Sequence, residues 1–145
     1  MLNRWVEDGL LATTEDEGMG VIAFSPLGQG MLTSKYLDGV PTGSRASENA
    51  TFSSGHLSEE NLARVRALND IASDRGQSLA QMAIAWVLRD PRVTTALVGA
   101  SRWTQISDSL GALENLAFSE SELANIDRYA VESDIDLWAT SSSQD

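Results

Sequence analysis

Cysteine is absent from the 145-residue sequence, and histidine occurs once, as His56. The absence of cysteine excludes disulfides, thiolate nucleophiles and cysteine-based zinc sites, and one histidine cannot form a histidine-rich metal site. No apolar run approaches the ~20 residues of a membrane-spanning helix. The first residues, MLNRWVED, lack the apolar core of a signal peptide. We therefore expect a soluble, cytoplasmic protein with no bound metal.

Positive charge is scarce, since 10 Lys and Arg face 21 Asp and Glu and give a net charge of −11. Nucleic acids and anionic membranes bind clustered basic residues, so neither is expected as a partner. The length suffices for one domain with a core. We treat residues 1–145 as a single domain with a loose tail at 139–145.

Apolar periodicity, predicted helix N-caps at Ser58, Ser78 and Ser119, and a helix end at Gly76 indicate an α/β chain. The pattern predicts a short helix or turn within residues 1–19, strands at 20–24 and 94–98, and helices at 58–75, 79–89, 103–114 and 120–131. Strand–helix alternation with apolar, buried strands implies parallel pairing. Two strands make a small parallel sheet, so residues 1–4 are a candidate third strand.

Two strand-to-loop transitions are the most informative segments. Residues 20–30 read GVIAFSPLGQG, and residues 94–102 read TTALVGASR. Parallel sheets bind ligands at the carboxyl ends of their strands, where small residues let a phosphate approach backbone N–H groups. The sequence therefore predicts a nucleotide or phosphate site on neighbouring strand ends, near Ser25 and Ser101.

The first transition offers an aromatic ring and a small-residue loop. Phe24 ends the strand, where its ring either stacks on a nicotinamide or similar heterocycle or fills the core. The loop after it is either a phosphate grip or a plain turn, and it consists of Ser25, Pro26, Leu27, Gly28, Gln29 and Gly30. Lys35 and Arg45 lie farther along the 25–56 connection and either contact phosphate oxygens or are solvated.

The second transition runs from Gly99 into a helix. Ser101 is predicted to cap that helix, and free N–H groups together with Arg102 would attract an anion such as a ribose phosphate. The alternative is an ordinary N-cap with a charged first turn. Gln105 lies one turn on and faces the same way, and Asp108 follows on that face, where it could accept a hydrogen bond from an adenine amino group.

Four ordered motifs give the chain a family resemblance: VIAFSPLGQGMLTSKY at 21–36, SRA at 44–46, LAQMAIAWVLR at 79–89 and LVGASR at 97–102. Together they resemble the aldo-keto reductases, with bacterial reductase members and potassium-channel β subunits the most similar. The resemblance covers nearly the whole chain. It implies the C-terminal part of a (β/α)8 TIM barrel, with about three parallel strands, flanking helices, and the two clear strands as the seventh and eighth.

The resemblance also implies NADP(H) as cofactor, bound without a Rossmann fold. Phe24 matches the ring that stacks on nicotinamide, and the loop after it matches the pyrophosphate loop. Lys35 and Arg45 match positions that close over the cofactor, so the 25–56 connection is expected to be a cofactor-closing loop. The adenosine-phosphate end is matched by Gly99, Ser101 and Gln105, with Arg102 as phosphate partner. Asp108 is shorter than the family's usual Glu, and Ser109 stands where Asn is common.

The catalytic tetrad of the family, an Asp, Tyr, Lys and His, belongs to the front half of the barrel. Nothing in this sequence matches it, so no catalytic residue is assigned, and Tyr36 and His56 are not substitutes. We expect the reductase to use NADPH to reduce aldehydes or ketones, with this chain supplying the cofactor-binding half and inactive alone. Its expected partner is the missing N-terminal half, or a second copy bound at an open sheet edge. A non-enzymatic half-barrel and a regulatory nucleotide-binding module remain alternatives.

Overall fold

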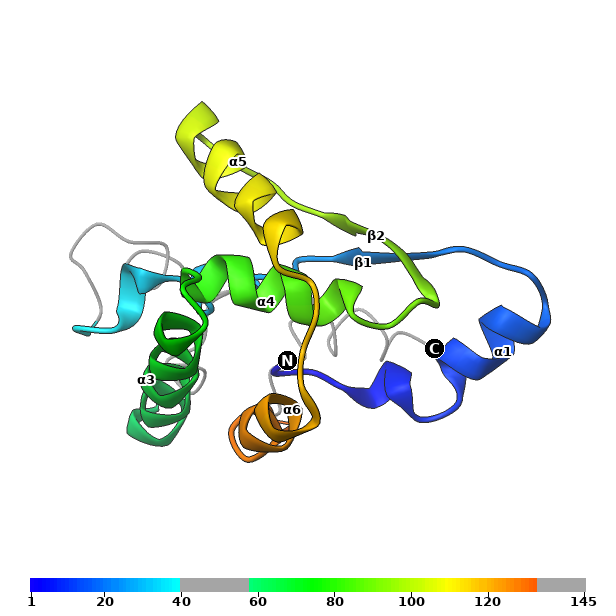
Figure 1. Cartoon of the computed structure of the whole chain (residues 1–145), viewed down its shortest axis with the longest axis horizontal. Coiled ribbons are helices and arrows are strands. Elements are labelled where there is room, and N and C mark those ends of the chain that lie inside the picture. The colour runs from blue at the N-terminus through cyan, green and yellow to red at the C-terminus, as the bar shows by residue number, and fades with distance from the viewer. Residues whose placement is uncertain (40–57, 133–145) are drawn as a thin grey trace, which may run out of the picture.

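The computed structural model describes residues 1–39 and 58–132 (Figure 1). Its helices and strands are, in chain order, α1 (Leu10–Asp16), β1 (Val21–Phe24), α3 (Glu59–Asp74), α4 (Leu79–Leu88), β2 (Val93–Leu97), α5 (Trp103–Leu110) and α6 (Glu120–Asp127). Single-turn 3-10 helices form at Trp5–Glu7, Gly28–Gly30, Ser34–Tyr36 and Gly111–Glu114. The predicted helices and the two clear strands are confirmed, with ends that shift by a few residues. Across the described ranges, every helix is too short or too polar to cross a membrane.

The two strands pair in parallel, with Phe24 opposite Leu97 in the last pair. This confirms the pairing predicted from strand–helix alternation. The predicted third strand in residues 1–4 is wrong, because the backbone there is not extended into a sheet. Met1 and Leu2 instead bury their side chains in the helical core. Within the described residues the sheet therefore has two strands.

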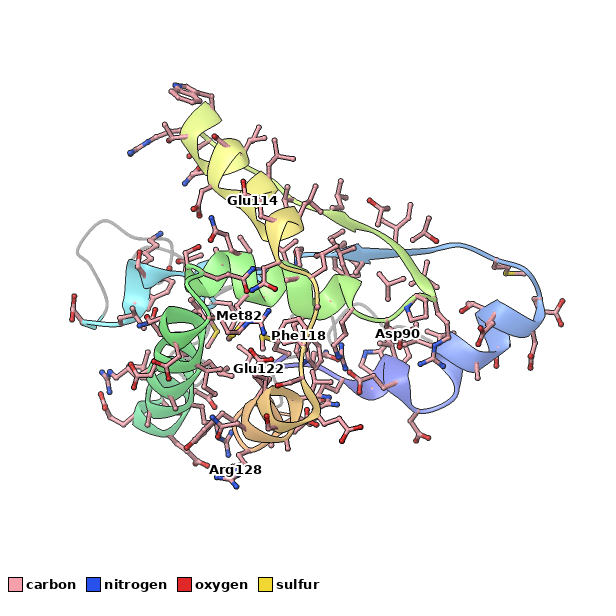
Figure 2. All side chains as sticks on the ribbon, viewed as in Figure 1. Met82, Asp90, Glu114, Phe118, Glu122 and Arg128 are labelled. Carbon is pink, nitrogen blue, oxygen red and sulfur yellow. The ribbon has the colours of Figure 1, made fainter. Side chains whose placement is uncertain are left out.

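Helix α4 lies between the strand pair on one side and α3 and α6 on the other (Figure 1). It is apolar nearly all round, which is typical of a helix covered on several sides. Its buried residues are Leu79, Ala80, Met82, Ala83, Ile84, Ala85 and Trp86. Of these, Leu79, Met82, Ala83 and Trp86 pack with α3, α6 and the first residues of the chain, and Figure 2 shows Met82 and Phe118 in this region. The hydrophobic core therefore lies on the helical side of α4.

Serine side chains begin three of the helices as the sequence predicts. The hydroxyl groups of Ser58, Ser78 and Ser119 each accept a hydrogen bond from a backbone N–H in the first turn of α3, α4 and α6. Such a cap contributes about 1 kcal/mol. Gly76 lies just past the end of α3 with a φ of +69°, a conformation that favours glycine. These local signals fix where the helices begin and end.

One face of the strand pair is open. Ile22, Phe24 and Leu97 are 63%, 57% and 62% exposed, and the alternation of side chains along a strand places them on one face. The opposite face packs against α4. The prediction of fully buried strands is therefore wrong for the first face, because no segment in the described ranges covers it.

Candidate functional site

The two small-residue loops leave the same end of the strand pair. Because β1 and β2 run in parallel and Phe24 lies opposite Leu97, the chain exits both strands at one edge. Ser25 follows Phe24 directly, and Ser101 comes four residues after Leu97. If Ser25 and Ser101 lay on opposite sides of the molecule, one ligand could not bind at both loops. In the structure both loops instead leave the strand pair at the same end.

The loop after β1 has an unusual backbone. Four of its residues have positive φ: Ser25 at 49°, Gly28 at 54°, Gln29 at 55° and Gly30 at 96°. Glycine adopts this region readily, whereas a serine or glutamine there costs about 1 kcal/mol or more. Hydrogen bonds hold the turn, since the Gly28 N–H donates to the Ser25 carbonyl at 2.9 Å and the Gly30 N–H to Leu27 at 3.0 Å. Strained backbone of this kind concentrates at functional sites.

The side chains of this segment divide into exposed and anchored ones. Phe24 is 57% exposed, so it is not part of the core that the described residues form. Ser25 is also exposed. Pro26 is buried and Leu27 packs against the core, so these two residues attach the loop to the rest of the protein. Phe24 and Ser25 are thus the side chains of this loop that a ligand at the strand ends can reach.

Two cations were predicted on the connection that follows. Lys35 is exposed, and its Nζ lies 5.2 Å from the centre of the Tyr36 ring. Arg45 lies outside the described residues, as does most of the 25–56 connection. The closing role of this connection therefore stays a prediction, and so does the loose tail at 139–145.

The loop after β2 holds its shape through Gln105. The Oε1 atom of Gln105 accepts hydrogen bonds from the backbone N–H groups of Ser101 at 2.9 Å and Arg102 at 3.2 Å, and from the Ser101 hydroxyl at 3.3 Å. The N-cap of α5 is Arg102, so the predicted cap at Ser101 is wrong. Two N–H groups predicted to be free are occupied, because the long Gln105 side chain reaches back one turn. The side chains of Ser101 and Arg102 stay exposed, next to the exposed Gly99.

Asp108 faces the start of α4. One carboxylate oxygen accepts a hydrogen bond from Gln81 Nε2 at 2.9 Å, and the other accepts one from the Ser78 hydroxyl at 3.3 Å. Sequence reasoning missed both partners. The S-x-x-Q spacing at 78–81 signals a capping box on α4, but it does not reveal that the same glutamine reaches a second helix. The predicted adenine contact of Asp108 stays a prediction.

Comparison with known proteins identifies the chain. Residues 1–130 match the aldo/keto reductase family. The chain belongs to the aldo/keto reductase family. It is similar to L-glyceraldehyde 3-phosphate reductase of Escherichia coli (strain K12), with 48% identity over 99% of this chain and 43% of the relative.

Two further relatives of this aldo/keto reductase carry different names. A putative voltage-gated potassium channel subunit beta of Schizosaccharomyces pombe is 39% identical over 74% of this chain and 33% of the relative. Protein tas of Escherichia coli (strain K12) is 40% identical over 88% of this chain and 36% of the relative. The chain thus spans less than half the length of these curated relatives.

Membership of the aldo/keto reductases accounts for the observed architecture. The family implies a (β/α)8 barrel, in which parallel strands alternate with helices. The order β1, α3, α4, β2, α5, α6 and the parallel pairing are consistent with a segment of such a barrel. In a barrel, the open face of β1 and β2 would point to the interior, and α4 would lie outside.

Proposed function

We propose that this aldo/keto reductase chain supplies the NADPH-holding part of a reductase that acts on aldehydes or ketones. The observation that carries the proposal is the common exit of the 25–30 and 98–102 loops at one end of the strand pair. Active sites of barrel enzymes lie at this end. Bound NADPH would supply the hydride, and the residues of this chain would bind and orient the cofactor.

The residues present fit this cofactor. The exposed Phe24 ring offers a flat apolar surface for a nicotinamide. Gly28 and Gly30 adopt left-handed backbone without strain, and they shape the loop at which a pyrophosphate would bind. Arg102 is exposed beside a loop that Gln105 holds in place, and its guanidinium suits a ribose phosphate.

A titration of NADPH, followed by its fluorescence, tests the proposal. Phe24→Ala and Arg102→Ala are each expected to weaken binding at least about fivefold, since each removes a contact of about 1 kcal/mol or more. Arg128→Ala is the control, because Arg128 is exposed at the C-cap of α6 and its loss should leave binding unchanged. Absence of binding at millimolar NADPH would contradict the proposal.

The reaction itself requires a complementing part. The proposed role of this chain includes no proton donor, and we propose that the rest of the barrel supplies one and binds the small carbonyl substrate. Neither this chain nor a separately produced front half of a relative should reduce an aldehyde alone, whereas the mixture should. NADPH binding by the mixture without reduction would favour a regulatory nucleotide-binding module.

The exposed face of the strand pair favours a second candidate. Ile22 and Leu97 are more than half exposed, and exposed apolar patches commonly mark interaction surfaces. A non-enzymatic half-barrel that binds a copy of itself would use this face and the strand edges. Self-association without any NADPH binding would support this candidate over the reductase.

A further inference from the structure

A hydrogen-bond network joins the first turn of α4 to the middle of α5. Gln81 Nε2 donates to the Asp108 carboxylate at 2.9 Å and to the Asp108 carbonyl at 3.0 Å. The Oε1 atom of the same side chain accepts from the Ser78 N–H at 3.0 Å, which closes the capping box of α4. Both ends of the Gln81 amide are therefore engaged, and they fix the position of Asp108 relative to the start of α4.

The packing around this network is tight. A Cβ added at Gly111 would lie 2.6 Å from Gln81 Nε2, closer than any ordinary contact. The chain just past α5 therefore has a glycine where the Gln81 amide needs the space. The glycine thus leaves room for the Gln81 amide in the position that its hydrogen bonds to Asp108 require.

The network continues toward the proposed cofactor site. Gln105 lies one helical turn before Asp108, and its side chain holds the backbone of Ser101 and Arg102. The Ser109 hydroxyl also donates to the Gln105 carbonyl at 2.8 Å. A shift of α5 at Asp108 would therefore move the loop that carries Ser101 and Arg102.

We propose that Asp108 is a positioning residue, which Gln81 holds at the start of α4 so that α5 presents Ser101 and Arg102 to the anionic end of the cofactor. The inference rests on the proposed function for its ligand. Each oxygen of the carboxylate accepts a hydrogen bond at the start of α4, one from Gln81 and the other from Ser78. In this role Asp108 acts through α5 and needs no direct contact with an adenine.

An exchange of donor and acceptor tests this role. Gln81→Glu keeps the oxygen that accepts the hydrogen bond from the Ser78 N–H but removes the amide donor. It also places a second carboxylate opposite that of Asp108. Asp108→Asn in the same chain restores a donor opposite the new carboxylate, and this double variant has the net charge of the wild type. Asp70→Asn, on an exposed position of α3, controls for the loss of one negative charge in Asp108→Asn alone.

The expected result is a rescue. Gln81→Glu should weaken NADPH binding about three- to tenfold, the size of effect that follows from losing one or two net hydrogen bonds, and the double variant should recover most of it. A double variant no tighter than Gln81→Glu would overturn the proposal.

The wild type should also bind NADPH and its deamino analogue, which lacks the adenine amino group, equally well. A preference for NADPH that Asp108→Asn abolishes would assign Asp108 to the adenine and overturn the proposal.

A second measurement separates this inference from the proposed function. Amide hydrogen exchange of residues 101–109 should become faster in Gln81→Glu and slow again in the double variant, with no cofactor present. If NADPH fails to bind but this pattern holds, the proposed function fails and the positioning contact stands. If NADPH binds and exchange is unchanged in Gln81→Glu, the positioning role fails and the proposed function stands.

Discussion

Arg75 is a buried charge that joins three parts of the chain. Its side chain is 3% exposed and pairs with the Glu122 carboxylate of α6. It donates to the Ala117 carbonyl at 3.0 Å, and its guanidinium carbon lies 3.7 Å from the centre of the Phe118 ring. Figure 2 shows Phe118 and Glu122 together beside α6. The planar guanidinium both stacks and donates in several directions, which a lysine cannot do.

We therefore expect Arg75→Lys to destabilise the fold even though the charge is kept. The ammonium would lose the ring stacking and at least one hydrogen bond, for a loss of about 2 kcal/mol in the free energy of unfolding. Urea unfolding followed by tryptophan fluorescence measures this. Arg128→Lys, at the exposed C-cap of α6, is the control and should change stability by less than about 0.5 kcal/mol.

At the scale of an element, the contacts that Glu122 makes at the start of α6 should weaken in acid. The backbone N–H and hydroxyl of Ser119, followed by the guanidinium of Arg75, hold the pKa of Glu122 below its ordinary value of 4.5. A carboxyl group whose pKa is lowered by folding stabilises the folded state above its unfolded pKa. That stabilisation is lost as the pH falls through the lower, folded pKa.

Glu122→Gln tests this contact, because glutamine keeps an acceptor for Ser119 but has no charge for Arg75. The variant should be less stable than the wild type at pH 7, and the difference should shrink as the pH falls below about 4.5. Chemical unfolding at pH 7, 5, 4 and 3 provides the comparison. Glu120→Gln, an exposed acid in the same turn, should give a smaller difference at pH 7. A difference for Glu122→Gln that does not depend on pH would refute the assignment.

Elements and loops were predictable from the sequence where the signal is local. Serine caps, Gly76 and apolar periodicity placed the helices, and the two strand-end loops followed from the parallel pairing. The burial of the strands was not predictable, since it depends on what covers Ile22 and Phe24. The contacts of Gln105 and Asp108 were also missed, because a polar side chain can reach back along its own helix or across to another. Arg75 resembled an ordinary charge at a helix end.

At the scale of the whole molecule, α5 and the 3-10 turn after it carry a second exposed apolar surface. Trp103 is 77% exposed, Ile106 49%, Leu110 59% and Leu113 56%. The first three are spaced along one face of α5, and Leu113 follows in the 3-10 helix Gly111–Glu114. Together with the exposed face of β1 and β2, this apolar stripe of four residues is the surface that the proposed complementing part of the barrel, or a second copy, would cover.

The chain alone is therefore expected to self-associate as its concentration rises. Leu110→Lys places a charge within the stripe and should weaken association at least about tenfold, since burying a leucine contributes about 2 kcal/mol. Met19→Lys is the control, because Met19 is 60% exposed in the turn between α1 and β1. Sedimentation velocity over a range of concentrations measures both. Equal association of the two variants would show that the stripe is not the contact.

Arg4 ties the first residues to the end of α6. Its guanidinium donates to the Asp127 carboxylate at 2.6 Å and to the Ala130 carbonyl at 3.0 Å, and its backbone N–H donates to Glu132 at 2.7 Å. The same guanidinium lies 5.1 Å from the Trp86 ring of α4. Arg4→Ala should therefore destabilise the helical core by about 2 kcal/mol, measurable as a lower urea midpoint, whereas Arg102→Ala should not.

The location of the core on the helical side of α4 has a consequence for how the molecule opens. Helices α3, α4 and α6 bury their side chains in one another, whereas β1, β2 and α5 contact only one side of α4. Local opening free energies follow buried apolar contact, so the strand layer should detach in partial unfolding events while the helical layer stays intact. The loops proposed to bind the cofactor would then lie in the part of the chain that opens most easily. A bound dinucleotide would stabilise the protein largely by preventing this local opening.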